Sequence, residues 1–368
     1  CALPISIKNM MLAAKKQYEL DKTDELDTEI NQLENRQMAI KILLNSLYGA
    51  MGNRWFRYYD LKIAEGITYS GQLAIRWAEK AMNNSINELL ETDEDYVITI
   101  DTDSLYVNFG PLVKKFNPKD PVKFLDQICK DHFEKNLEKS YKKLNYKMNC
   151  HTSRMVMARE AIADRGIWTA KKRYILNVWD SEGVRYKEPK MKIMGLETAR
   201  SSTPQYFRDK LYAAFKIIIS KTNDELISFV NAVRAETKEQ GQEGVAFPRG
   251  VNNLEKYRSR TDIYCKGTPI HVRGALLYND FVKKNKLEHK YPYIQEGEKI
   301  KFIYLKTPNP LHENCVSFFS TIPPEMKLDK YVDYQLQFEK SFLEPLKNVL
   351  QCVGWTHEKK VTIGSFFA

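Results

Sequence analysis

Two aspartates stand two positions apart between apolar segments. Asp101 and Asp103 are flanked by the β-prone residues 96–100 and 105–109, which predict a β-hairpin with a polar tip. Side chains at i and i+2 of an extended chain point to one face, so the two carboxylates repel each other. Oxygen-only ligands suit Mg²⁺ or Mn²⁺, and two such ions ~3.5–4 Å apart promote phosphoryl transfer. The alternative is an ordinary polar turn, because Asp, Thr and Ser favour turns.

A helix-forming segment carries a cation, an amide and a phenol on one face. Lys41, Asn45 and Tyr48 fall at i, i+4 and i+7 within residues 24–51. Lysine supplies a point charge for phosphate, so this face suits a phosphorylated ligand that contains a ring. Gly49 follows, and its small size permits close approach of the backbone to a ligand. The alternative is a helix that ends at glycine beside a solvated lysine. The apolar residues between them occupy other sectors of the helix and can pack: Ile42, Leu43, Leu44 and Leu47.

A cationic run interrupts a β-rich stretch at Lys171, Lys172 and Arg173, and Tyr174 follows it. If the run lies on a strand, Lys171 and Arg173 face one side and Lys172 and Tyr174 the other. Cations beside an aromatic ring suit contacts with the phosphates and sugars of a nucleic acid. The alternative is a solvated run of charges on an edge strand.

The elements that position these residues alternate between helical and β-rich segments. Residues 5–20 and 24–51 predict two helices, and their short polar link predicts an antiparallel hairpin. Helices are also expected at 70–91, about 121–148, 204–238 and 328–353, and strands over 154–193 with turns at 164–166 and 181–183. Residues 247–325 are rich in Pro and Gly and predict irregular structure. This order predicts an α+β fold with a mostly helical last third.

Composition bounds the function classes. The chain has 368 residues, which suggests two or three domains, and its 43% hydrophobic content argues against disorder. The net charge of +10 weakly favours a polyanionic partner. Six scattered cysteines without a C-x-x-C pair argue against a zinc site or a disulfide framework. No apolar run approaches ~18 residues, which argues against a membrane span, and the expected location is the cytoplasm.

Together these residues resemble the family B DNA polymerases, in particular the replicative polymerases of T-even type tailed phages. The resemblance rests on KILLNSLYGAMGNRWFRYYD (41–60), DTDSLYV (101–107), REAI (159–162), WTAKKRYILNVWD (168–180), KIMGLETARSSTP (192–204) and TPIHVRGALLYN (268–279). These segments occur in the family's order over nearly the whole chain. One departure lies before D-T-D-S, where Thr99-Ile100 replaces the usual Tyr-Gly. This departure affects how closely the backbone is expected to approach the primer end, and it does not affect the expected metal binding.

The resemblance implies a right-hand polymerase, active as a nucleotidyltransferase on primer–template DNA with deoxynucleoside triphosphates. Residues 1–52 would form helical-hairpin fingers, 53–199 most of an antiparallel β-sheet palm, and 200–354 a mostly helical thumb. It implies two Mg²⁺ ions, with Mn²⁺ as a substitute, held by Asp103 with Asp101 in support and Glu160 nearby. The implied nucleotide-binding residues are Lys41, Asn45, Tyr48, Gly49 and Lys8, of which Lys41 also acts in catalysis. The implied primer-binding residues are Lys171, Lys172, Arg173, Tyr174 and Lys192.

One family motif is absent. D-x-x-S-L-Y-P-S supplies a second essential metal-binding Asp, and Pro4 stands roughly where the family has an Arg. We therefore expect a C-terminal portion of a replicative polymerase that is active only with an N-terminal segment carrying the exonuclease and the rest of the palm. Because Cys1 could accept an upstream acyl group through its thiol, it predicts a splice junction after an intein. The alternative is an expression boundary.

The last residues carry an apolar-x-x-aromatic-aromatic spacing at Ile363, Phe366 and Phe367. Exposed phenylalanines need burial, and residues 355–368 resemble the sliding-clamp-binding peptide of replicative polymerases. The alternative is a tail that folds onto the thumb. Two other functions stay open at this point. One is a non-catalytic polymerase-like subunit that binds DNA and recruits the clamp, and the other, less fitting, is an RNA-directed polymerase.

Overall fold

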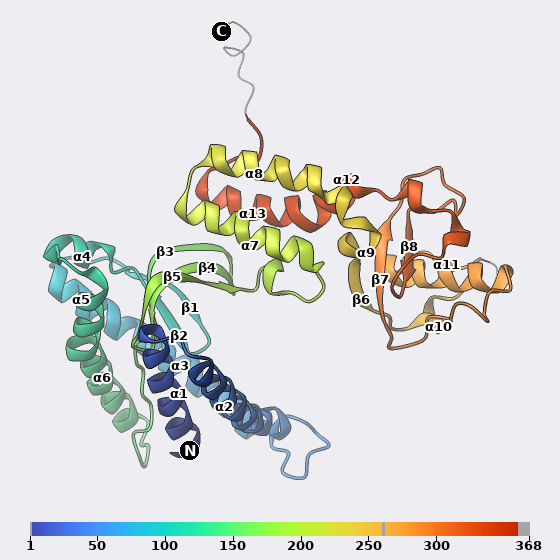
Figure 1. The fold of residues 1–368 in the computed structure, drawn as a ribbon. Helices are drawn as coiled ribbons and strands as arrows, with labels where there is room; N and C mark the ends of the chain where they lie inside the picture. Colours follow the sequence, from blue (N-terminus) through green and yellow to red (C-terminus); the bar gives the residue numbers. More distant parts are fainter. Residues whose placement is uncertain (1, 260–261, 360–368) are drawn as a thin grey trace, which may run out of the picture. The chain divides into compact units, whose positions relative to one another are not determined.

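The computed structural model describes residues 2–259 and 262–359 (Figure 1). The chain forms two compact units. The first comprises Cys1–Arg165 and Asn177–Lys190, and the second comprises Gly166–Leu176 and Met191–Ala368. Helices and three small antiparallel sheets make up the described residues, which confirms the predicted α+β class.

The first unit begins with the predicted helical hairpin. Helices α1 (Ala2–Leu20) and α2 (Asp24–Met51) lie side by side, and Lys15 of α1 forms an ion pair with Glu34 of α2 at 3.5 Å. The side chain of Thr23 accepts the Leu26 N–H, which caps the start of α2. Buried Ile7, Met11 and Leu33 form the apolar contact between the helices. The antiparallel arrangement predicted from the short link is therefore confirmed.

Helix α3 (Leu61–Leu90) begins well before the predicted residue 70. The reason is Asp60, whose carboxylate accepts the N–H groups of Lys62 and Ile63 and so starts the helix. The C-terminal half of α3 packs into a core with the following elements. These are β1 (Val97–Asp101), β2 (Ser104–Val107), α4 (Gly110–Phe116), α5 (Pro121–Ile128), a π-helical turn (Cys129–Phe133) and α6 (Glu134–Lys147). Buried Ala78, Ile86 and Phe133 lie at the centre of this core.

A second sheet has the strand order β3–β4–β5, with β3 (Ala161–Ala170), β4 (Arg173–Ser181) and β5 (Val184–Met194). The turn predicted at 181–183 is confirmed. The turn predicted at 164–166 is wrong, because these residues lie inside β3. Gly166 is there for packing reasons: a Cβ at this position would lie 2.5 Å from the Trp168 ring.

The second unit contains a helical cluster. It consists of α7 (Gln205–Ser220), α8 (Asn223–Glu236), a 3₁₀ turn (Thr237–Gln240), α9 (Gly241–Val245), α12 (Tyr334–Phe338), a π-helical turn (Glu339–Leu343) and α13 (Glu344–Val353). Buried Phe207, Phe215, Val230 and Phe342 form its core. The helical prediction for 204–238 is confirmed. The last predicted helix begins at Tyr334, after short 3₁₀ turns, and not at residue 328.

The prediction of irregular structure over 247–325 is wrong. This region contains β6 (Phe247–Gly250), α10 (Leu254–Tyr257), α11 (Ile270–Lys284), β7 (Lys299–Tyr304) and β8 (Cys315–Phe318). The strands form a third sheet of order β6–β7–β8, and buried Phe302 of β7 shares one core with Val272 and Leu276 of α11. Helix α11 approaches β8 closely at Gly274, where a Cβ would lie 2.7 Å from the Ser317 nitrogen. Within the described part of the chain, no helix combines the length and apolarity needed to cross a bilayer.

Candidate functional site

The β1–β2 hairpin presents the paired aspartates at its tip. Asp101 pairs with Ser104 in register, so Thr102 and Asp103 form the two-residue loop. Thr102 has a left-handed backbone (φ 58°), and its hydroxyl donates to the Asp101 carboxylate at 3.0 Å. The Asp103 N–H donates to the Asp101 carbonyl at 2.7 Å. This bonding leaves the Asp103 side chain exposed and Asp101 half-buried, as the predicted polar tip requires.

The tip fits part of a metal site. Carboxylate oxygens are the ligands that hard divalent cations prefer. Across residues 2–259 and 262–359, however, no three His, Cys, Asp or Glu side chains gather into a group that could hold a metal ion. Asp101, Asp103 and Glu160 therefore do not form a three-ligand site by themselves. Glu160 is exposed immediately before β3, and its carbonyl accepts the Glu182 N–H at 2.6 Å.

The three predicted nucleotide-binding side chains of α2 are all exposed on its C-terminal half: Lys41, Asn45 and Tyr48. The Tyr48 hydroxyl forms a hydrogen bond with the hydroxyl of Thr68 at 2.9 Å, which ties the phenol to α3. A Cβ built at Gly49 would meet no described atom within 4 Å, so the space beside it is open. The face is therefore available to a ligand.

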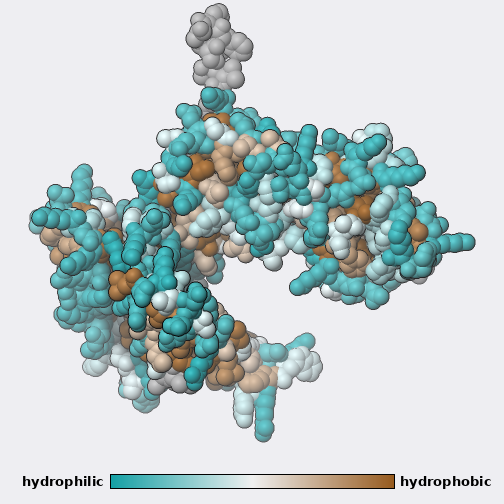
Figure 2. Space-filling model, in the orientation of Figure 1, coloured by the Kyte–Doolittle hydropathy of each residue, from teal (hydrophilic) through white to brown (hydrophobic). Residues whose placement is uncertain are grey.

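The apolar residues of this segment, which could pack, are not buried by the described residues. Ile42, Leu43, Leu44 and Leu47 are between 47% and 72% exposed. The N-terminal half of α3 adds exposed Leu61, Ile63, Ile67 and Leu73. Figure 2 shows apolar residues at the surface over α2. Exposed apolar surface of this kind is typical of a protein interface.

An aromatic and cationic segment after α2 was missed by the sequence analysis. Trp55 is 84% exposed, and the Arg54 guanidinium lies 5.3 Å from its ring centroid. Arg57 lies 5.7 Å from the ring of Tyr58, which is also exposed. Exposed rings paired with arginine suit stacking on nucleic-acid bases. The alternation of Arg and aromatic residues in NRWFRYYD was the available signal.

The cationic run of the second unit forms a turn and not a strand. Lys171 and Lys172 connect β3 to β4, and Lys172 has a φ of 63°, so the predicted strand alternation is wrong for them. Both side chains are exposed. Gly195, with a φ of 67°, follows the end of β5, and a Cβ there would lie 2.2 Å from the Lys172 carbonyl oxygen. The chain just after Lys192 therefore passes directly against this turn.

The two residues that follow this turn are engaged by the protein itself. The Arg173 guanidinium donates to both carboxylate oxygens of Glu197, at 2.8 and 3.1 Å. Tyr174 is buried, with its ring centroid 6.2 Å from that of Trp168. Of the predicted primer-binding residues, the exposed lysines of the turn are therefore the most accessible.

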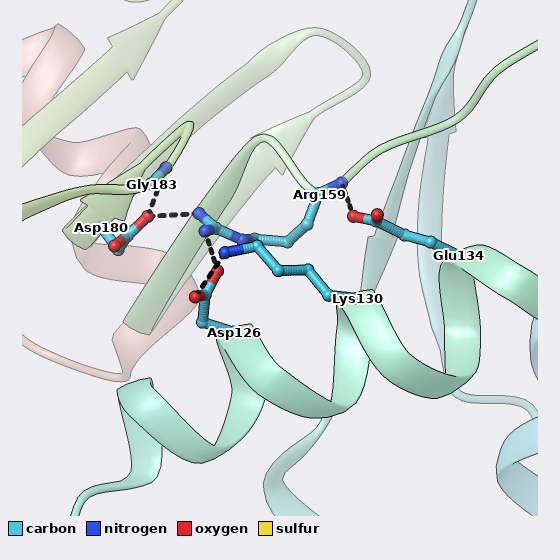
Figure 3. A network of polar contacts seen from close by, with 6 residues as sticks. All are labelled: Asp126, Lys130, Glu134, Arg159, Asp180 and Gly183. Carbon is cyan, nitrogen blue, oxygen red and sulfur yellow. Dashed lines mark hydrogen bonds and ion pairs between the residues drawn. The ribbon is translucent and has the colours of Figure 1, made fainter. Parts of the chain in front are cut away.

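A buried arginine, next to Glu160 in the sequence, links two elements of the first unit through ion pairs. The Arg159 side chain is 8% exposed and forms ion pairs with Asp126 of α5 and Asp180 of β4, as Figure 3 shows. The Arg159 N–H donates to the Glu134 carboxylate at 2.8 Å. Asp180 also accepts the Gly183 N–H at 2.9 Å. Sequence reasoning missed this network, because its partners are far apart along the chain.

Charges in this network shift two pKa values. Burial acts to raise the pKa of Asp126, but hydrogen bonds from Lys130 and Arg159 outweigh it and leave that pKa below its ordinary value. Burial likewise acts to lower the pKa of Arg159, and its two carboxylate partners raise it instead. Cys129 follows α5, and burial raises the pKa of its thiol to about 12, so it stays protonated at neutral pH.

Four predicted residues lie outside the described residues. They are Cys1 and the tail residues Ile363, Phe366 and Phe367.

Comparison with known proteins decides the family. The model of DNA polymerase family B matches residues 1–353, which is nearly the whole chain. The chain belongs to DNA polymerase family B. The DNA-directed DNA polymerase of Escherichia phage RB69 is 35% identical over 90% of this chain and 38% of its own length. That of Enterobacteria phage T4 is 32% identical over 94% of this chain and 40% of its own length.

A less similar polymerase also matches. The DNA polymerase delta catalytic subunit of Drosophila melanogaster is 24% identical over 88% of this chain and 28% of its own length. The chain spans about two fifths of the length of the two phage polymerases.

Proposed function

We propose that the chain supplies part of the active site of a replicative DNA-directed DNA polymerase. The observation that carries the proposal is the exposed Asp103, presented beside Asp101 at the tip of the β1–β2 hairpin in a family B chain. The reaction is template-directed addition of a deoxynucleotide to a primer 3′ end with release of pyrophosphate.

The proposed domains follow the elements. Residues 1–52, with α1 and α2, form the fingers, and residues 53–199 form the larger part of the palm. Residues 200–354 form the thumb, and residues 355–368 form a clamp-binding tail. The β1–β2 tip and the Lys171–Lys172 turn both belong to the proposed palm.

Residues of the first unit act on the nucleotide. Asp103 would hold metal ions, with Asp101 in support and Glu160 nearby. When bound, two Mg²⁺ ions, or Mn²⁺ in their place, would supply electrostatic stabilisation of charge on the transferring phosphoryl group. Lys41 neutralises charge on the triphosphate and on the departing pyrophosphate, and Lys8 adds a second cation. The nascent base pair lies against three α2 residues, which are Asn45, Tyr48 and Gly49.

Residues of the second unit hold the primer strand. Lys171 and Lys172 are exposed at the β3–β4 turn, where their ammonium groups suit the phosphates of a backbone. Arg173, Tyr174 and Lys192 flank this turn and complete the proposed primer grip. Contacts of this type carry no base information, which a polymerase that copies any template requires.

The proposed metal site takes a further carboxylate from another segment. We propose that an N-terminal polymerase segment carries it. Two observations support this partner: the described residues gather no three-ligand group, and the apolar residues of α2 and α3 are exposed. Burial of such residues stabilises an interface by about 25 cal/mol per Å² before the costs of association.

Reconstitution tests the proposed function. We expect primer extension by the chain mixed or joined with the N-terminal polymerase segment, and none by the chain alone, measured on a labelled primer–template. Primer–template binding without extension in the mixture would instead support a non-catalytic subunit.

Deletion of residues 362–368 tests the proposed clamp contact. Without the clamp, we expect unchanged synthesis per binding event, because none of the proposed active-site residues is deleted. With the sliding clamp present, the products of the deletion variant should be no longer than its products without the clamp. Equal loss of extension with and without the clamp would contradict the assignment.

A further inference from the structure

The proposed triphosphate-binding Lys8 already has an anionic partner. Its ammonium group forms an ion pair with the carboxylate of Glu182, which lies in the turn between β4 and β5. The two side chains are 39% and 28% exposed, so the pair is only partly shielded from water. A ligand that binds the Lys8 ammonium therefore competes with the Glu182 carboxylate for it.

The turn that carries Glu182 is fixed by three contacts. Glu182 and Gly183 both have left-handed backbones, with φ values of 51° and 82°, as a two-residue hairpin loop requires. The Glu182 N–H donates to the Glu160 carbonyl, and the Gly183 N–H donates to the Asp180 carboxylate. Asp180 is in turn bound by the buried Arg159 (Figure 3). The backbone that carries the Glu182 side chain is therefore held in place by hydrogen bonds on both residues of the turn.

Helix α1 is held along the same hairpin. Glu19, near the end of α1, forms an ion pair with Lys190 of β5 at 2.7 Å. The Lys16 ammonium lies 3.6 Å from where a Cβ of Gly183 would be. With Lys8 at the turn and Glu19 further along β5, the helix is attached at two points. Loss of the Lys8 contact alone is therefore expected to leave α1 in place.

We propose that Glu182 is a positioning residue that holds the Lys8 ammonium until the triphosphate of an incoming nucleotide replaces it. This inference rests on the proposed role of Lys8 in nucleotide binding. A triphosphate carries several negative charges against the single charge of Glu182, so it can displace the carboxylate. Because one partly exposed ion pair must be broken, nucleotide affinity is about two- to fivefold lower than it would be without Glu182.

The first test measures Lys8 in the chain itself, without polymerisation. We expect Glu182→Gln to raise the rate of Lys8 acylation about two- to fivefold, because a carboxylate-paired ammonium reacts slowly. Inorganic tripolyphosphate should protect Lys8 at a lower concentration in the variant than in the wild type. Lys15, which pairs with Glu34, is the internal control. Unchanged Lys8 labelling in Glu182→Gln would overturn the proposal.

The second test uses the polymerase assembled with its N-terminal segment. We expect Glu182→Gln to lower KM for the deoxynucleotide about two- to fivefold, with kcat changed less than about twofold. In a Lys8→Ala background the same substitution should have no effect, since the pair no longer exists. Glu188→Gln is the matched control, because it removes an exposed carboxylate from the same hairpin.

The outcomes separate the two proposals. Additive effects of Lys8→Ala and Glu182→Gln on KM would overturn the role of Glu182 while leaving the polymerase assignment intact. A wild-type assembly that binds primer–template but does not extend it would overturn the proposed function. In that case the Lys8 labelling experiment still decides whether Glu182 competes with polyphosphate.

Discussion

Asp103→Asn is expected to lower the rate of single-nucleotide incorporation by the assembled polymerase by on the order of 10³-fold. The amide keeps the shape of the side chain but loses the negative charge that a divalent cation requires. Because Asp103 is exposed at the hairpin tip, the substitution should leave the fold intact. Primer–template binding should also persist, since the proposed primer grip belongs to the second unit. Rapid-quench incorporation and fluorescence anisotropy measure the two quantities.

Asp131→Asn is the matched control for this substitution. Asp131 is an exposed carboxylate of the same unit and forms only a surface ion pair with Lys135 at 3.5 Å. We expect its incorporation rate to stay within about twofold of the wild type. If Asp103→Asn extends primers at the wild-type rate, the metal assignment is wrong. If it loses DNA binding together with incorporation, Asp103 has a structural role that its exposure does not reveal.

Local signals explain where sequence reasoning worked. The polar link before α2 contains Thr23, which caps the helix, so both helix boundaries could be predicted from residue type alone. The β1–β2 hairpin was equally clear, because two apolar runs flank a polar tip. In both regions the elements contact their neighbours along the chain. Such contacts leave their signature in a short window of sequence.

Tertiary contacts explain where it did not. Gly166 is typical of a turn, yet it lies in a strand because the Trp168 ring fills the space of a side chain. The third sheet was missed because β6 pairs with the distant β7, with Phe247 opposite Phe302. No short window contains both strands.

The same limit applies to the candidate site. The prediction that Lys41, Asn45 and Tyr48 lie on one helix is confirmed, and their role in nucleotide binding stays a prediction. The partner of Lys8 is 174 positions away in sequence and became visible only in the structure. The exposure of the apolar residues within 42–47 also became visible only in the structure, because their sequence pattern is the same whether they are buried or exposed.

Arg159→Met is expected to destabilise the first unit by about 3–5 kcal/mol. The substitution keeps most of the side-chain volume but leaves Asp180, itself only 7% exposed, without its cation. Half-buried Asp126 loses one of its two cations and keeps Lys130, at 2.7 Å. The pKa of Asp126 is held below its ordinary value of 3.8, so its contribution to stability is present above that pH. This contribution is lost as the pH falls through the lowered pKa. The difference in unfolding free energy between variant and wild type should therefore be largest near neutral pH and shrink below about pH 4.

Arg185→Met is the control that separates this network from a general loss of positive charge. Arg185 lies on the same hairpin, but its pair with Asp120 at 3.5 Å is exposed, so we expect a change below about 1 kcal/mol. Urea unfolding of the first unit at several pH values gives both free energies. Adding Asp180→Asn to Arg159→Met should recover part of the stability, because an amide oxygen still accepts the Gly183 N–H while the unpaired charge is gone. A loss below about 1 kcal/mol in Arg159→Met, or no recovery in the double variant, would show that the buried charges are solvated by other means.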